Sequence, residues 1–160
     1  MNNIIELILI TLLPFLELRA SIPWGIIKQG MGWPAVFAVC VITNILLAPV
    51  IYFFLDRIIH LFLRIRFIDR IYQHYVEKTQ KKIHKYVEKY GEWAVAVFVG
   101  IPLPGSGVYS GMLAAYLIGL GYRKSFYAAI IGVLIAGIIV TAVSVSGAEA
   151  FYFFIKPSGN

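Results

Sequence analysis

Two oppositely charged residues, Glu17 and Arg19, interrupt the first apolar stretch of this 160-residue chain. An ionised side chain near the centre of a bilayer costs about 2.5–3.5 kcal/mol or more, so it usually faces a protein interior or a watery cavity. Residues two apart point to nearly opposite faces of a regular helix, but an unwound segment before Pro23 would let both side chains share a site. We therefore predict a buried pair whose arginine grips phosphate or carboxylate. In the alternative, both side chains snorkel at the membrane surface.

A second candidate group surrounds a break rich in proline and glycine, which begins at Ile101 with Ile-Pro-Leu-Pro-Gly-Ser-Gly and continues to Tyr109, Ser110 and Gly111. Glycines allow close backbone approach, and a half-helix that begins here would present free N–H groups that favour an anion. Gly107 and Gly111 also have the spacing of tight helix packing, which is the alternative. A nucleotide-binding loop is excluded because no Lys-Ser/Thr follows the glycines.

Asn44 lies near the middle of the uncharged stretch 35–55, where a buried amide needs hydrogen-bond partners. It either completes a substrate site or only holds helices together. His60, His74 and His84 have no zinc-binding spacing of i,i+4, and none lies in an apolar stretch where it could activate a serine. We therefore expect no enzyme activity, no metal site and no cofactor.

The composition predicts a membrane protein. Apolar residues make up 60% of the chain and charged residues only 14%, where a soluble domain has about 25% charged residues. A single cysteine, Cys40, excludes a disulfide scaffold. Residues 35–55 and 125–148 carry no charge and are each long enough to cross a bilayer core of about 30 Å as a helix.

Two further apolar stretches, 4–31 and 94–122, are broken by proline and glycine and cannot be continuous helices. Backbone groups freed at such breaks must be buried in protein or line a wet cavity. Each stretch is therefore predicted to enter the membrane as a helical hairpin and turn back. Four ordinary spans are the alternative.

The positive charge is concentrated in one interior segment, since nine of the 14 Lys and Arg residues lie between positions 57 and 89. The positive-inside rule places this segment in the cytoplasm. Tyrosines and aliphatic residues recur there at helical spacing, which predicts an amphipathic helix on the inner membrane surface, bound to anionic lipid rather than to nucleic acid. A solvated connector is the alternative. The predicted lipid-surface residues are Lys78, Lys81, Lys82, Lys85 and Lys89.

With the basic segment inside, the first hairpin opens outward and the second inward, so the two halves have opposite topology, as in transporters built from inverted repeats. We predict a single all-α integral membrane domain over 1–160, in which a re-entrant hairpin and a transmembrane helix form each repeat. The first repeat is 1–55, the basic amphipathic segment 56–92 and the second repeat 93–160. A homodimer in a prokaryotic inner membrane is the default expectation.

Four motifs carry a family resemblance: Glu17-Leu-Arg-Ala-Ser-Ile-Pro23, Thr43-Asn-Ile-Leu-Leu-Ala-Pro49, Ile101-Pro-Leu-Pro-Gly-Ser-Gly107 and Ile131-Gly-Val-Leu-Ile-Ala-Gly137. They resemble the putative small multidrug-export proteins, a family that looks like a compact relative of the DedA membrane-protein superfamily. The resemblance implies paired re-entrant hairpins in inverted repeats. For the wider superfamily it implies translocation of lipids, including polyprenyl phosphates, often coupled to protons.

The predicted function is transport of an anionic amphiphile, such as a lipid or polyprenyl phosphate. One alternative is proton-driven export of cationic drugs, with Glu17 binding proton and drug in turn. Another is a scaffold that recruits partners through its basic helix. The predicted substrate-binding residues are Glu17, Arg19, Ser21, Asn44, Gly105, Ser106, Gly107, Tyr109 and Ser110.

Overall fold

The computed structural model describes residues 3–14, 16–62, 78–103 and 105–155, and within these the side chains outside 59–86 and 148–155. Every regular element in these ranges is helical. The predicted all-α class is therefore confirmed for the described part of the chain.

Two helices are long and apolar enough to cross a membrane: α3 (Trp33–Phe62) and α7 (Tyr122–Ile155). Each contains a 26-residue apolar section, Trp33–Ile58 in α3 and Tyr122–Gly147 in α7, which agrees with the two predicted spans. At 1.5 Å per residue, such a section is about 39 Å long and would tilt in a bilayer. Pro49 lies inside α3 without ending it.

The stretch before α3 folds into two packed helical segments, α1 (Asn3–Leu12) and α2 (Glu17–Pro23), and α2 continues into the π-helical turn η1 (Trp24–Lys28). The chain reverses before Glu17, and Pro23 lies inside the helix. This differs from the predicted unwound segment before Pro23, because Arg19 is already helical. Beyond Pro23 the helix widens by one residue per turn, since Gln29 donates its backbone N–H to the Trp24 carbonyl at 3.0 Å, an i→i+5 bond.

The second half repeats this order with α5 (Lys78–Gly100) and α6 (Val108–Leu117), which pack together before α7 begins. The α5 helix runs without interruption from the basic residues into the apolar ones and crosses the predicted division at 92–93. All five predicted lipid-surface lysines lie on α5. The side chains of Lys78, Lys81, Lys82 and Lys85 fall outside the described residues, and that of Lys89 is exposed.

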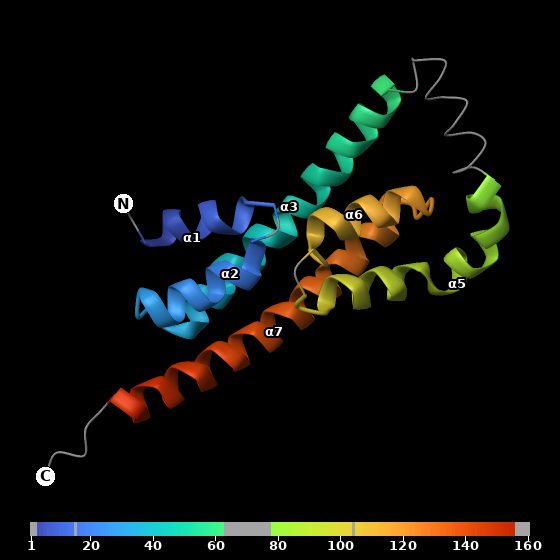
Figure 1. Ribbon diagram of the computed structural model, residues 1–160. Helices are drawn as coiled ribbons and strands as arrows, with labels where there is room; N and C mark the ends of the chain where they lie inside the picture. Colours follow the sequence, from blue (N-terminus) through green and yellow to red (C-terminus); the bar gives the residue numbers. More distant parts are fainter. Residues whose placement is uncertain (1–2, 15, 63–77, 104, 156–160) are drawn as a thin grey trace, which may run out of the picture.

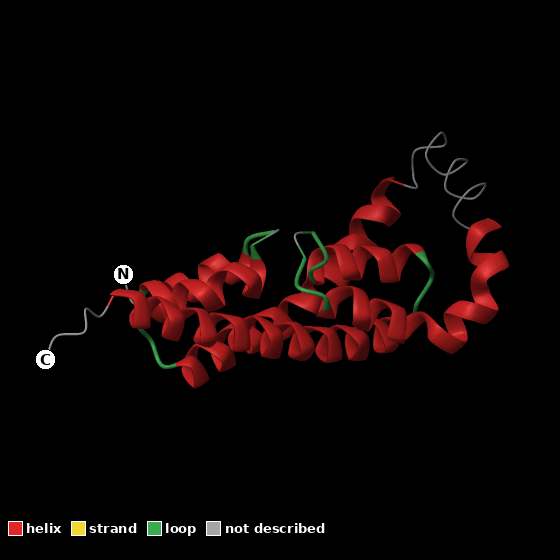
Figure 2. Cartoon of the chain, turned by 60° about the horizontal axis from the view of Figure 1, so that its bottom comes forward, coloured by secondary structure: helices red, strands yellow, loops and turns green. Residues whose placement is uncertain are grey.

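The turn after α1 and the turn after α5 face each other at the centre of the molecule (Figures 1 and 2). The beginning of α1 and the end of α7 lie at one end, whereas the end of α3 and the beginning of α5 lie at the other (Figure 1). Small residues allow the helices to approach closely: a Cβ at Gly132 of α7 would come within 2.7 Å of the Ala96 carbonyl of α5. The packing therefore brings both turns to one central place.

Candidate functional site

The Glu17 carboxylate caps the beginning of α6 from across the molecule. Its Oε2 accepts the backbone N–H of Val108 at 3.0 Å, and its Oε1 accepts that of Tyr109 at 3.2 Å. The capping position itself is Gly107, which has no side chain to offer. A helix beginning leaves N–H groups unsatisfied and carries a partial positive charge, so an acid is favourable there. The side chain of Glu17 is only 2% exposed.

Arg19 binds backbone carbonyl groups near the end of α5. Its Nη2 donates to the Val99 carbonyl at 3.0 Å and to the Ser106 carbonyl at 2.8 Å, and its Nη1 donates to Glu17 Oε2 at 3.0 Å. The last carbonyls of a helix carry a partial negative charge, which favours a cation. The acid therefore meets the beginning of one half-helix, and the base meets the end of the other.

The backbone at Glu17 explains how residues two apart reach one place. Its φ of +46° is in the left-handed region, which a non-glycine residue rarely adopts. Arg19 follows in regular helix, and the changed direction at Glu17 brings the two side chains together. The prediction that the pair shares a buried site is consistent with this geometry, with the irregular backbone confined to Glu17 and the turn before it.

The predicted residues of the second turn surround this pair. A Cβ at Gly107 would overlap the Glu17 carboxylate, so a larger residue there would displace the carboxylate. The Ser106 hydroxyl is 3.3 Å from Arg19 Nη2 and 2.9 Å from the Leu103 carbonyl. The Ser110 hydroxyl donates to the Gly105 carbonyl at 2.5 Å. Both hydroxyls thus hold the turn in place.

A small cavity of about 50 Å³ remains between the two turns. This is room for one or two water molecules and no larger guest. The Tyr109 hydroxyl donates to the Leu12 carbonyl at 2.6 Å and ties the first turn to α6. The two turns therefore pack closely against each other. Lining the cavity are Pro14, Glu17, Arg19, Gly105, Gly107, Tyr109 and Ser110.

Ser21 and Asn44 lie away from this cavity, in the core of the first half. Ser21 Oγ is 2.7 Å from Thr11 Oγ1 and 3.1 Å from Cys40 Sγ, so it joins three elements. Asn44 lies one helical turn beyond Cys40 and is fully buried, and its side-chain amide has no hydrogen-bond partner among the described residues. The structure thus brings seven of the nine predicted substrate-binding residues together around the cavity. Ser21 reaches only the backbone carbonyl of Glu17, at 3.1 Å, and Asn44 lies apart.

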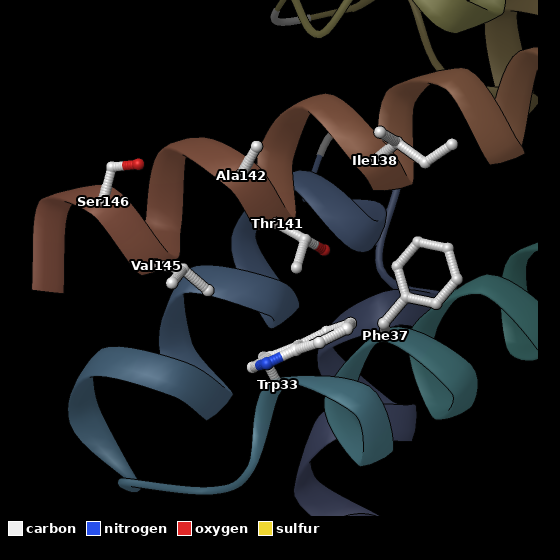
Figure 3. Close-up of a pocket in the computed structure, with 7 residues that line it drawn as sticks. All are labelled: Trp33, Phe37, Ile138, Thr141, Ala142, Val145 and Ser146. Atoms are coloured by element: carbon white, nitrogen blue, oxygen red, sulfur yellow. The ribbon is translucent and has the colours of Figure 1, made fainter.

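A larger apolar cleft of about 480 Å³ lies between α3 and α7, where Trp33 and Phe37 face Thr141 and Val145 (Figure 3). The Thr141 hydroxyl is buried without a hydrogen-bond partner in the described structure. This cleft was not predicted from the sequence. Its signal was the aromatic pair four residues apart on α3, opposite the small residue Ala142.

Among the described residues, no group of three His, Cys, Asp or Glu could hold a metal ion. In comparisons with known proteins, the family model described as putative small multi-drug export protein matches residues 17–139, from Glu17 into α7. No curated protein and no solved structure matches the chain.

Proposed function

Because the chain belongs to the putative small multi-drug export protein family, we propose that it is a membrane transporter whose substrate is an amphiphile with an anionic headgroup, such as a lipid or polyprenyl phosphate. A relationship to the DedA superfamily is part of this proposal. Family membership and the two long apolar helices place the protein in a membrane. The substrate class is inferred from the contacts of Glu17 and Arg19 between the two turns at the centre of the molecule.

The observation that carries the proposal is that Glu17 occupies an anion site. Its carboxylate is held by the Arg19 guanidinium and by the N–H groups of Val108 and Tyr109 at the beginning of α6. A guanidinium and a helix beginning are also the groups that bind phosphate in proteins. The buried carboxylate thus stands where the substrate's phosphate would bind.

Proton coupling follows if the substrate's phosphate takes the place of the Glu17 carboxylate. A proton taken up by Glu17 removes its negative charge, and Arg19 and the beginning of α6 then lack an anion. An incoming phosphate can replace the carboxylate only if the two turns separate, because the closed cavity holds about 50 Å³. When the phosphate leaves, Glu17 loses its proton and returns to its place. Movement of one repeat against the other would expose the site alternately to each side of the membrane.

The hypothesis is tested with labelled lipids in proteoliposomes. We expect phosphatidylglycerol to cross faster than phosphatidylcholine, and a pH gradient to change the rate. In Glu17→Gln the rate becomes independent of pH, because the amide cannot exchange a proton. Equal rates for both lipids in the wild-type protein, matching those of protein-free vesicles, would contradict the proposal.

The arrangement of the two halves supports the further proposal that both helix pairs are re-entrant hairpins in inverted repeats. The α1–α2 pair precedes α3 as the α5–α6 pair precedes α7, and the two turns meet centrally (Figure 2). In this proposal the basic segment is cytoplasmic at the inner membrane, by the positive-inside rule.

Labelling of single cysteines from each side of the membrane tests this topology. In a Cys40→Ala background, Lys28→Cys and Arg123→Cys are expected to react with a membrane-impermeant maleimide from opposite sides, Lys28→Cys from outside. Both native side chains are exposed. Labelling of both positions from the same side would show that the hairpins do not have opposite topology.

A second candidate function, export of cationic drugs, is favoured by the cleft between α3 and α7. Aromatic and aliphatic side chains line it, and Trp33 and Phe37 could lie against an organic cation. In this case Glu17→Gln abolishes drug resistance while Arg19→Ala is tolerated, and Trp33→Ala weakens binding of a cationic dye to the purified protein.

A further inference from the structure

A cavity of about 560 Å³ opens between α5, the loop that joins α6 to α7, and the beginning of α7. We call it the loop cavity. Arg123 and Lys124 of α7 lie on its wall, with Glu88 of α5 among the other lining residues. In this loop Gly119 has a φ of +77°, and a Cβ at Gly121 would meet nothing within 4 Å. This cavity is more than ten times as large as the one at the Glu17–Arg19 pair.

Aromatic residues place the loop cavity at the level of the lipid headgroups. The apolar section of α7 begins at Tyr122, which also lines the cavity. The ring centroids of Tyr122 and Tyr116 lie 5.4 Å and 5.6 Å from that of Tyr52. The Tyr52 hydroxyl donates to the Leu120 carbonyl of the loop at 3.1 Å. Tyrosine is enriched where the hydrocarbon meets water, so the cavity lies at this boundary.

The charge of the wall favours an anion. Arg123 and Lys124 are exposed, and Lys124 Nζ makes one long hydrogen bond of 3.4 Å to the Glu88 carbonyl, which leaves it other donors. With Glu88 as the acid in the lining, the wall carries one net positive charge. Basic pockets between helices at the membrane surface bind lipid headgroups, and a guanidinium grips phosphate through two parallel hydrogen bonds.

We propose that the loop cavity binds the phosphate of an anionic phospholipid headgroup through Arg123 and Lys124. A lipid fits better than a soluble phosphate, because Val87, Ile118 and Tyr122, the last 48% exposed, also line the cavity and offer apolar surface to the adjoining acyl chains. This site is separate from the Glu17–Arg19 pair and does not depend on transport.

The test measures which lipids the purified full-length protein retains, by native mass spectrometry from detergent containing either phosphatidylglycerol or phosphatidylcholine. The variant is Arg123→Gln/Lys124→Gln. The matched control is Lys28→Gln/Arg57→Gln, which removes the same charge from exposed positions outside the cavity. Melting temperatures of both variants show that each is folded.

We expect the wild-type protein and the control to retain phosphatidylglycerol over phosphatidylcholine, and the Arg123→Gln/Lys124→Gln variant to lose about tenfold in apparent affinity for phosphatidylglycerol, since charged hydrogen bonds are lost. Unchanged retention in this variant would overturn the proposal. So would equal retention of the two lipids by the wild-type protein. A rise in melting temperature with inorganic phosphate alone, absent in the variant, would show a soluble-phosphate site instead.

Discussion

Replacing Arg19 with alanine is expected to reduce lipid translocation to the level of protein-free vesicles. The guanidinium is the cation of the proposed anion site, and it also holds the Val99 carbonyl near the end of α5 and the Ser106 carbonyl in the turn before α6. Removing one partner of a buried ion pair costs about 3–5 kcal/mol, because the remaining charge is left unpaired. The melting temperature of Arg19→Ala should therefore fall as well. Loss of translocation in this variant alone does not distinguish loss of substrate binding from destabilisation of the fold.

Arg19→Lys makes that separation. Lysine keeps the charge and can pair with Glu17, but a single ammonium cannot reach Glu17, Val99 and Ser106 with the fork of a guanidinium. We expect this variant to fold and to translocate about 10- to 100-fold more slowly, which corresponds to the loss of one charged hydrogen bond of about 1.5–3 kcal/mol. The control is Lys28→Gln, an exposed cation whose Nζ lies 3.8 Å from the Trp24 ring centroid. Wild-type rates in folded Arg19→Lys and Arg19→Ala would exclude Arg19 from the substrate site.

The sequence predicts the meeting of the two broken stretches because charge inside an apolar segment needs a partner. Glu17 and Arg19 have no other charge near them in the first stretch, and the second stretch offers the ends of two half-helices at its proline and glycine residues. What could not be predicted is that the partners are backbone groups some 80 to 90 positions away. Glu17 accepts N–H groups of α6, and Arg19 donates to a carbonyl of α5. That pairing depends on tertiary packing and on the left-handed backbone at Glu17.

Two local patterns in the sequence do not coincide with helix ends. Pro23 predicts a break, but α2 runs through it into the π-helical turn η1, and the chain reverses earlier, before Glu17. The change from basic to apolar residues near position 92 does not coincide with a helix end, and α5 continues to Gly100. Helix ends depend on which backbone groups find other partners, and composition alone does not reveal this.

A methyl group at Gly107, in the turn before α6, is expected to disrupt the contacts of Glu17 at the centre of the molecule. The φ of Gly107 is −89°, so alanine can adopt the same backbone without strain. Its Cβ would nevertheless overlap the Glu17 carboxylate, which must then leave the N–H groups of Val108 and Tyr109. We expect Gly107→Ala to lose about 3–5 kcal/mol of unfolding free energy, as for a broken buried pair, and to lose translocation.

Gly105→Ala is the matched control, because it separates backbone strain from contact. Gly105 has a φ of +85° and nothing within 4 Å of its Cβ position, so alanine there costs only the left-handed conformation, about 1–2 kcal/mol. Gly107→Ala should therefore be the more harmful of two changes that add the same methyl group.

Shortening the acid, as Glu17→Asp in the Gly107→Ala background, should recover part of the melting temperature, since it makes room for the added carbon. If Gly107→Ala melts and transports like the wild-type protein, the carboxylate does not need its place at the beginning of α6, and the anion site built on it is wrong.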